Sequence, residues 1–247
     1  MNKGLNDITL SPIGIVNSPY KEKFAIPRQP GLVNAAKGTV RLLGAVNSTD
    51  SVRELAQFSH IWLIFVFHGT QEQSWKPLVR PPRLGGNKKV GVLATRSTFR
   101  PNPIGMSVVK LDKIEMVKQD VILHIAGMDL LDQTPIVDIK PYIPYSDSLP
   151  NANAGFAQAQ PQINLKVKFS EQALSALPKL EKELPELTLL IEQVLAQDPR
   201  PAYKQNKADD KIYGMNLYNL NIQWKMLNDK VIEVILINDL HQHISKS

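Results

Sequence analysis

Short apolar segments separated by turn-forming residues dominate the first two thirds of this 247-residue chain. Such runs of Val, Ile and Leu, bounded by Gly, Pro, Asn or Asp, are typical of β-strands. The pattern predicts strands at Ile8–Val16, Thr39–Leu43, His60–Phe67, Lys89–Thr95, Met106–Ile114 and Val121–Ala126. One short helix is expected after Asp50, where Ser51 and Glu54 match a capping box. Because helices do not alternate with these strands, the pattern favours a small, mainly β barrel or sandwich that carries its function on loops.

The last third of the chain has a different pattern. A polar stretch of small residues at Asn151–Pro161 is typical of a linker or a mobile loop. Beyond it, the hydrophobic spacing predicts a strand at Ile163–Phe169, helices at Ser170–Leu177 and Pro185–Ala196, and strands near Ile212–Lys225 and Lys230–Ile237. We therefore expect a mainly β domain over residues 1–160 and a smaller α+β domain over residues 161–247.

Positive charge is concentrated in the first of these domains. The net charge of the chain is +6. Residues 1–150 hold 18 Lys and Arg against 12 Asp and Glu, whereas residues 151–247 hold 11 of each kind. No acidic residue lies between Gln73 and Leu111, a segment with eight basic residues. A cationic segment of this kind suits a polyanion such as a nucleic acid, and an ordinary solvated surface is the alternative.

Composition and motifs exclude several classes of protein. The chain has no cysteine, so it has no disulfide, thiolate nucleophile or cysteine zinc site. It has no G-x-G, Walker A or G-x-S-x-G motif and no H-x-x-x-H spacing, which leaves nucleotide loops, serine hydrolases and histidine metal pairs without support. The longest apolar run, Ile61–Phe67, is too short to span a membrane, and the N-terminus lacks the features of a signal peptide. We expect a cytoplasmic protein that uses neither a membrane nor a metal.

Four loops rich in proline and polar residues are the candidate sites. They are Tyr20–Gly31, Val79–Gly86, Thr95–Gly105 and Met128–Lys140. Each is either a surface connection or a ligand-binding loop. In the third loop, a Pro-Asn-Pro sequence stiffens the segment that carries Arg96 and Arg100. The fourth loop has three carboxylates but lacks the ligand count and the glycine of a calcium loop, so we do not expect a metal there. Several such loops beside a basic segment favour a site on a β scaffold.

The motifs in these loops resemble those of one known family. The resemblance to the TrmO (TsaA-like/YaeB) family rests on SPYKEKFAIPRQPG, FSHIWLIFVFH, VRPPRLGGN, TRSTFRPNPIGMS, DLLDQTPIVDIKPYIPYSDS and VLAQDPRPAY, and it extends from Ile8 to about Trp224. It implies an S-adenosylmethionine-dependent tRNA methyltransferase. The implied acceptor is N6 of threonylcarbamoyladenosine, next to the anticodon of threonine tRNA. The resemblance also implies a cofactor domain that is a single-sheeted small β-barrel, and a homodimer.

The same resemblance implies the residues of the site. Carried over motif by motif, the residues that bind S-adenosylmethionine are Pro27, Arg28, Gln29, Phe67, His68, Arg96, Met106, Met128, Asp129, Leu130 and Leu131. Candidate contacts to the RNA or to its modified base are Tyr20, Lys21, Arg80, Arg83, Arg100, Asn102, Arg200 and Tyr203. In this division Arg96 contacts the cofactor, whereas Arg100 contacts the RNA or the substrate.

A hypothesis for the mechanism follows. Methylation of a urea-like nitrogen releases a proton, and a nearby carboxylate is expected to accept it. Asp138, with Lys140 beside it, is the first candidate for this catalytic base, and a structural ion pair of the two is the alternative. Asp129 is expected to bind hydroxyl groups of the cofactor. The cation that pairs with the threonylcarbamoyl carboxylate is sought among Lys140, Arg28 and Lys21.

Contacts with RNA leave more alternatives open. The basic segment Lys76–Arg100 is expected to bind phosphates with a salt-dependent affinity. Tyr20, Phe24, Phe99 and Tyr203 are candidates for stacking on unpaired bases. Arg200 and Tyr203 either close over the active site, in one chain or across a dimer, or anchor the packing of the second domain. Three rival functions remain: a tRNA-binding protein without catalysis, a methyltransferase that acts on another substrate, and a hydrolase that uses the carboxylates of residues 129–138, which only their number supports.

Overall fold

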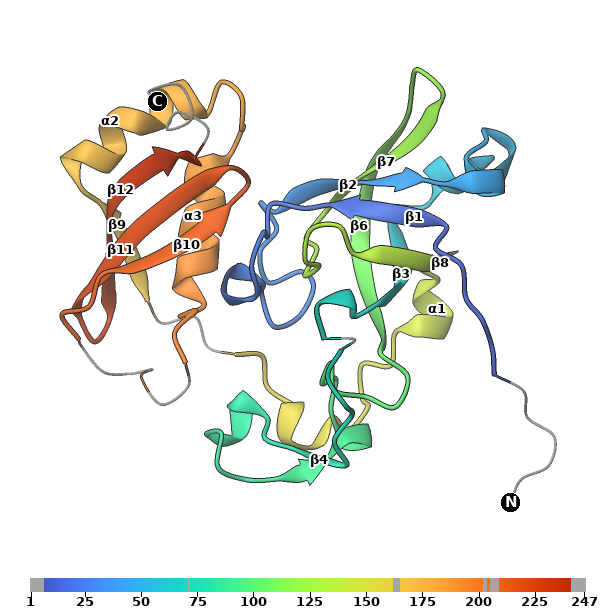
Figure 1. Cartoon of the computed structure of the whole chain (residues 1–247), viewed down its shortest axis with the longest axis horizontal. Coiled ribbons are helices and arrows are strands. Elements are labelled where there is room, and N and C mark those ends of the chain that lie inside the picture. The colour runs from blue at the N-terminus through green and yellow to red at the C-terminus, as the bar shows by residue number, and fades with distance from the viewer. Residues whose placement is uncertain (1–6, 71, 162–164, 202–203, 205–208, 241–247) are drawn as a thin grey trace.

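The protein folds into two units that lie side by side (Figure 1). The structure is a computed structural model that describes residues 7–70, 72–161, 165–201, 204 and 209–240. The first unit is a closed barrel, and the second is a four-stranded sheet with two helices packed on it. The mainly β fold with a smaller α+β part, predicted from the sequence, is confirmed. The proposed division at residue 160 stays a prediction.

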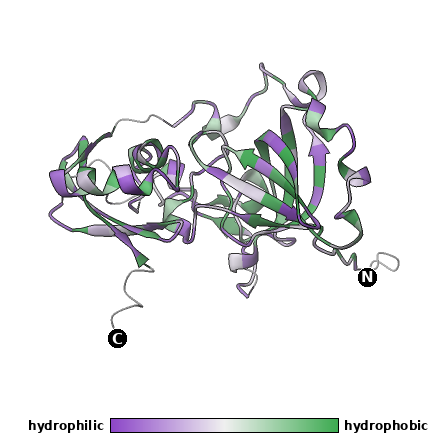
Figure 2. Ribbon diagram, turned by 90° about the horizontal axis from the view of Figure 1, so that it is seen from above, coloured by the Kyte–Doolittle hydropathy of each residue, from purple (hydrophilic) through white to green (hydrophobic). Residues whose placement is uncertain are grey.

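Six antiparallel strands form the barrel. They are β1 (Gly14–Asn17), β2 (Lys37–Leu42), β3 (His60–Val66), β6 (Ile104–Val117), β7 (Asp120–Ala126) and β8 (Pro135–Pro141). Their order around the barrel is β1-β2-β7-β6-β3-β8. Successive side chains of a strand point to opposite faces, so apolar and polar positions alternate along the ribbons (Figure 2). In β3, for example, Ile61, Leu63 and Phe65 point inward and are buried.

A short two-stranded arm projects from the barrel between β3 and β6. Its strands are β4 (Leu78–Val79) and β5 (Val90–Gly91), and it lies at the bottom of the view in Figure 1. The arm carries Arg80, Arg83, Lys88 and Lys89, which are half of the basic residues in the acid-free segment. Part of the positive charge of this segment thus lies on a projection, where a large partner can reach it.

The second unit combines strands and helices in mixed order. Its elements are β9 (Lys166–Phe169), α2 (Glu171–Leu180), α3 (Leu187–Ala196), β10 (Tyr213–Leu217), β11 (Leu220–Asn228) and β12 (Val231–Asp239); a short helix, α1 (Pro144–Asp147), precedes them. The sheet order is β10-β11-β12-β9, and only the β12–β9 pair is parallel. Helix α2 begins where the Ser170 hydroxyl accepts a hydrogen bond from the Ala173 N–H. The apolar faces of both helices are buried against the sheet.

The loop between β1 and β2 joins the two units. Tyr20 in this loop forms a β-bridge with Leu217 of β10. The carboxylate of Glu22 accepts the Asn216 N–H at 2.8 Å. The buried residues of the barrel and of the second sheet belong to one continuous core. The second unit is therefore packed against the barrel.

Two strand predictions were wrong. The segment that forms β8 was expected to be a loop, because it lies between Pro135 and Pro141. Both prolines stand at the ends of the strand, where a missing N–H is tolerated. The segment Ile212–Lys225 was expected to be one strand but is a hairpin, whose turn includes Tyr218 at φ 53°.

Two further expectations failed at the level of local backbone geometry. The predicted strand at Lys89–Thr95 is extended only over β5, and the chain then forms a 3-10 turn at Val92–Ala94. The helix predicted after Asp50 is replaced by two separate 3-10 turns. Glu54 lies between them in the left-handed region at φ 67°, so it cannot occupy the third position of a capped helix.

One prediction concerns the close contact between β1 and β2. A Cβ atom at Gly38 would lie 2.7 Å from the Met128 Cε and would also clash with the carbonyl oxygen of Asn17. We expect Gly38→Ala to lower the free energy of unfolding by about 1–3 kcal/mol, because a backbone atom has to move. Gly91→Ala is the matched control, since no atom lies within 4 Å of the added methyl group. Urea unfolding followed by tryptophan fluorescence measures both, and equal effects would contradict the proposed clash.

Candidate functional site

A cavity of about 520 Å³ lies at the end of the barrel where β3 ends and β6 begins. Four loop segments line it, within residues 23–29, 67–70, 95–100 and 129–134. These segments are far apart in the sequence and meet only because the barrel closes. The volume is within the range of cavities that hold a small organic ligand.

Aromatic and aliphatic side chains form the walls of the cavity. The rings of Phe65 and Phe67 contact each other edge to face, with their centroids 5.2 Å apart. Gly105 pairs with Phe65 across the strands, and a Cβ at this glycine would lie 2.8 Å from the Phe67 ring. Only glycine allows β6 to approach these rings so closely. Leu130 and Leu131 add further apolar surface.

The loop that carries Arg96 and Arg100 is braced from within. The Arg100 guanidinium donates to the carbonyl oxygens of Thr95 at 2.6 Å and Val92 at 3.4 Å. The Thr95 hydroxyl also donates to Val92 O, at 2.8 Å. Arg100 therefore stabilises the loop, and its predicted contact with RNA stays a prediction. Arg96 lies at the cavity and donates to the Gln29 Oε1 at 2.6 Å.

Asp129 is the one carboxylate among the described residues that line the cavity. The Ser107 hydroxyl donates to its Oδ1 at 2.5 Å. Burial raises the pKa of Asp129 to about 6, although the Ser107 hydrogen bond and the charge of Arg96 oppose this shift. The carboxylate is thus ionised near neutral pH but remains more basic than an exposed aspartate. Shifts of this size are common at functional sites.

The rest of the polar lining is basic or neutral. The Lys23 ammonium donates to the carbonyl oxygen of Gly69 at 2.9 Å. Burial lowers the pKa of His68, Asp132 opposes this shift, and the charge of Lys23 adds to it. At neutral pH the imidazole of His68 is therefore mostly uncharged.

The structure brings together almost all residues that were predicted to bind the cofactor. Those that line the cavity are Pro27, Arg28, Gln29, Phe67, His68, Arg96, Met106, Asp129, Leu130 and Leu131. The exception is Met128, which is fully buried beneath the loop, next to Gly38. The motif positions were thus good guides to a shared location.

The two predicted catalytic residues, by contrast, do not line the cavity. Asp138 pairs with Ile64 across the strands, and Lys140 pairs with Trp62, so both side chains lie on the outer face of the barrel. The Lys140 ammonium contacts the Asp138 carboxylate at 2.8 Å. This placement agrees with the alternative, a structural ion pair, and the role of Asp138 as the base stays a prediction.

The predicted RNA contacts near the first loop need revision. Tyr20 is completely buried at the junction of the two units, so its ring cannot stack on a base and that prediction was wrong. Lys21 forms an ion pair with Asp132 at 2.7 Å, so its charge is already compensated. Neither residue lines the cavity.

The predicted contacts in the second and third loops remain on the surface. Arg80 and Asn102 are exposed, as an RNA contact requires. The Arg83 guanidinium donates to the carbonyl oxygen of Ala159 and thereby ties the arm to the segment that precedes the second sheet. Their contact with RNA stays a prediction.

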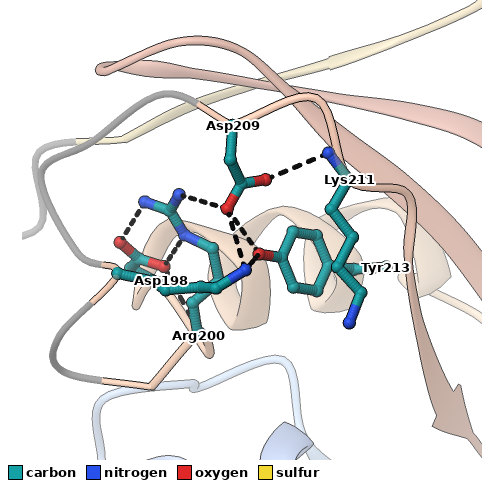
Figure 3. Close-up of polar contacts among 6 residues, drawn as sticks. Asp198, Arg200, Asp209, Lys211 and Tyr213 are labelled. Atoms are coloured by element: carbon teal, nitrogen blue, oxygen red, sulfur yellow. Dashed lines mark hydrogen bonds and ion pairs between the residues drawn. The ribbon is translucent and has the colours of Figure 1, made fainter.

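Arg200 belongs to a polar cluster in the second unit (Figure 3). Its side chain has no exposed surface, and its Nε and Nη2 each donate to Asp198 at 2.8 Å. Asp209 lies 3.9 Å from the Arg200 guanidinium and accepts a hydrogen bond from the Tyr213 hydroxyl at 2.6 Å. A buried guanidinium held in this way favours the packing alternative over RNA contact. Tyr203 lies outside the described residues.

Sequence reasoning missed several residues of the cavity, both apolar and polar. Lys23, Gly105 and Ser107 were not singled out as site residues, yet all three line it. Ser107 gave a usable signal, because it is a polar residue at an inward position of an otherwise apolar strand and is 1% exposed. Lys23 gave none, because lysines are common in surface loops.

Within the described part of the chain, no three His, Asp or Glu side chains are grouped so that they could hold a metal ion. None of the helices described there is long and apolar enough to cross a membrane.

Comparisons with known proteins agree along nearly the whole chain. Residues 15–148 match the family model of the tRNA-methyltransferase O N-terminal domain, and residues 162–240 match that of the TrmO C-terminal domain. The tRNA (adenine(37)-N6)-methyltransferase of Escherichia coli K12 is 51% identical over 222 residues, which cover 90% of this chain and 94% of that protein. A putative S-adenosylmethionine-dependent methyltransferase of Pseudomonas aeruginosa is 46% identical over 92% of this chain and 96% of its own length. The crystal structure of TrmO from Pseudomonas aeruginosa superposes with a TM-score of 0.80 at 38% identity, and covers 95% of this chain and 100% of that one.

The raised pKa of Asp129 predicts a pH-dependent effect on stability. Because its pKa is about 6 in the folded protein and about 4 in the unfolded chain, ionisation makes folding less favourable as the pH rises through this window. Asp129→Asn should therefore gain up to about 2 kcal/mol relative to the wild type between pH 4.5 and pH 7.5. Thermal unfolding at several pH values measures this. Asp138→Asn serves as the control on the outer face, and a pH-independent difference for Asp129→Asn would contradict the prediction.

Proposed function

This chain belongs to the TrmO family, and on that basis we propose that it transfers a methyl group from S-adenosylmethionine to N6 of adenosine 37 in tRNA. The observation that carries the proposal is the convergence of the family's separated loop motifs on one cavity that contains a single carboxylate. On the resemblance of the motifs, we extend the proposal to threonylcarbamoyladenosine in threonine tRNA as the acceptor.

The residues of the cavity fit S-adenosylmethionine. Its adenine and aliphatic parts suit the apolar walls, which include Phe67 and Leu131. Its carboxylate suits a guanidinium, and Arg28 and Arg96 both line the cavity. The volume of about 520 Å³ leaves room for the acceptor base to approach.

The contribution of the protein is alignment and the exclusion of water. Bound in the cavity, S-adenosylmethionine supplies an activated methyl group. Arg100 stabilises the loop that carries Arg96 through its hydrogen bond to the Thr95 carbonyl oxygen. The Arg96 guanidinium is held at the cavity by its own hydrogen bond to Gln29. Gly105 lets β6 close against the rings of Phe65 and Phe67, which keeps this wall apolar. Fixed geometry of this kind accounts for a large part of the acceleration of a bimolecular reaction.

We assign the proton acceptor to Asp129 in place of Asp138. N6 loses a proton when it is methylated, and Asp129 is the carboxylate that lines the cavity. Ser107 holds one carboxylate oxygen, Oδ1, in place. A pKa of about 6 leaves the group ionised at neutral pH and yet more basic than an exposed aspartate.

The arm between β3 and β6 is the proposed surface for tRNA. Arg80, Lys88 and Lys89 are exposed there, and no acid interrupts the segment. The Lys76 ammonium lies 5.3 Å from the centre of the Phe99 ring. Such a surface binds phosphates through release of counterions. A protein that acts on tRNA in this way is proposed to work in the cytoplasm.

We also propose that the protein is a homodimer. The family resemblance suggests it, and two apolar side chains at the rim of the cavity support it, because Ile104 is 38% exposed and Met106 is 49% exposed. Exposed apolar surface beside a site is typical of protein interfaces.

The decisive experiment uses tRNA from a strain that lacks this gene. The purified protein and S-adenosylmethionine are added, and the nucleosides are analysed by mass spectrometry. We expect one methyl group on threonylcarbamoyladenosine of threonine tRNA. Binding of the cofactor without transfer would favour the tRNA-binding rival, and transfer to another nucleoside would refute the proposed substrate.

The two aspartates give a sharp test of the mechanism. Asp129→Asn should lower kcat by at least about 100-fold, because it removes the base. Asp138→Asn should keep kcat within about threefold, because its carboxylate lies outside the cavity. If Asp129→Asn weakens cofactor binding as strongly as it lowers turnover, its role is cofactor binding and the assignment of the base is wrong.

The arm predicts a salt effect. The double variant Arg80→Ala, Lys88→Ala should reduce the slope of log affinity for tRNA against log salt concentration by about 1 per residue. Filter binding at several salt concentrations measures the slope. Lys179→Ala, Lys182→Ala in the second unit is the matched control, and an equal change there would show that only net charge matters.

A further inference from the structure

The Lys23 ammonium lies in the lining of the cavity without an acidic partner. Its hydrogen bond goes to a neutral acceptor, the carbonyl oxygen of Gly69, at 2.9 Å. Within the described residues, no carboxylate lies within 4.0 Å of this ammonium. Its positive charge instead contributes to the lowered pKa of the neighbouring His68 imidazole.

Several lysines of the protein are, by contrast, already paired with an acid. Seven others in the described part of the chain lie within ion-pair distance of a carboxylate: Lys21, Lys37, Lys110, Lys113, Lys140, Lys204 and Lys225. Lys21 and Lys140, two cations considered from the sequence for the acidic substituent of the substrate, are among them. The structure therefore directs attention to a residue that the sequence did not single out.

The stem of Lys23 lies next to Gly69. A Cβ added at Gly69 would lie 3.4 Å from the Lys23 Cε and 3.3 Å from Leu131, so both side chains approach this glycine. Lys23 as a whole is exposed, and the hydrogen bond to the Gly69 carbonyl oxygen places its ammonium at the cavity.

The lining of the cavity carries more positive than negative charge. The cofactor of the proposed function has one carboxylate, for which Arg28 and Arg96 are available. Arg100 is occupied by the carbonyl oxygens of its own loop. Lys23 remains as an additional positive charge in the same cavity that contains the proposed base, Asp129.

We propose that Lys23 is a specificity residue that binds a carboxylate on the N6 substituent of the acceptor base. The proposal rests on the function given above and deepens it, because it explains why the substrate is an adenosine with an acidic substituent and not adenosine itself. A group attached to N6 enters the cavity with the reacting nitrogen, whereas the phosphates of the RNA stay with the backbone outside. The Lys23 ammonium at the cavity wall is therefore placed to pair with the carboxylate of this substituent.

The test compares two RNA hairpins with the sequence of the anticodon arm of threonine tRNA. One carries adenosine at position 37, and the other carries N6-threonylcarbamoyladenosine. Affinities are measured with S-adenosylhomocysteine present, so that no reaction occurs. We expect the wild-type protein to bind the modified hairpin about 10- to 100-fold more tightly, as a charge-assisted hydrogen bond allows. Lys23→Met should reduce this preference to within about threefold and leave the affinity for the unmodified hairpin unchanged.

Two variants complete the design. Lys23→Arg keeps the charge and should retain most of the preference. Lys113→Met removes the same charge from an exposed site on β6 and should retain the full preference. Cofactor affinity should be unchanged in all three variants.

Four outcomes would overturn the proposal. An equal loss of affinity for both hairpins in Lys23→Met would mean a contact with phosphate. A tenfold loss of cofactor affinity would mean that Lys23 binds the cofactor's carboxylate. A preference that survives in Lys23→Met would remove the residue from recognition while the proposed function stands. A wild-type protein that methylates the unmodified hairpin equally well would refute both the acidic substrate and the role of Lys23.

Discussion

The pairing of β3 with both β6 and β8 is the constraint on which the rest of the structure depends. It places Val66 opposite Ile104 and Phe65 opposite Gly105, so the loops that follow β3 and precede β6 start side by side. On the other edge, the pairing with β8 closes the barrel. Because strand register determines which side chains point inward, a slip of one residue would exchange the inner and outer faces and remove the cavity wall.

The chemistry of the cavity follows from an imbalance of charge in a partly apolar space. A single carboxylate faces several cationic groups, and burial makes it more basic than it would be in water. The same burial makes the ionised carboxylate unfavourable for folding, a combination that is common where a group is kept for its reactivity. The two arginines of this loop differ in their contacts. Arg100 donates a hydrogen bond to a carbonyl oxygen of its own loop, whereas Arg96 lies at the cavity and donates to the Gln29 side chain.

The loop between β1 and β2 connects this cavity with the second unit. Its first part bonds to β10 through Tyr20 and Glu22, and its next residues, from Lys23 to Gln29, line the cavity. The second unit thereby stabilises a cavity wall that would otherwise be an exposed loop. Arg83 makes a second connection, from the basic arm to the segment before the second sheet. RNA bound by the arm would therefore contact an element that is tied to the segment connecting the two units.

Much of the cavity could be predicted from the sequence. The stiff loop around Pro101 and Pro103, the basic arm and the strands with clear alternation depend on local chemistry, and each was predicted near its true place. The family motifs also led to Arg28, Arg96 and Asp129. Errors arose where local signals conflicted with long-range pairing. The β8 segment has prolines at both ends and is a strand only because β3 and β1 supply partners.

The sequence by itself determined which loops carry the function, because proline, arginine and aspartate express their geometry and charge locally. Only the tertiary structure decided which charges are available. Asp138 and Asp129 are residues of the same type, so the sequence alone does not separate their roles. Asp138 lies on the outer face with Lys140, whereas Asp129 lines the cavity. Lys21 and Lys23 are two residues apart, yet one is paired with Asp132 and the other is bonded only to a neutral carbonyl oxygen. The partner of Lys21 is 111 positions away and that of Lys23 is 46 positions away, and strand pairing sets the face on which Asp138 lies, so no local pattern could have separated these pairs.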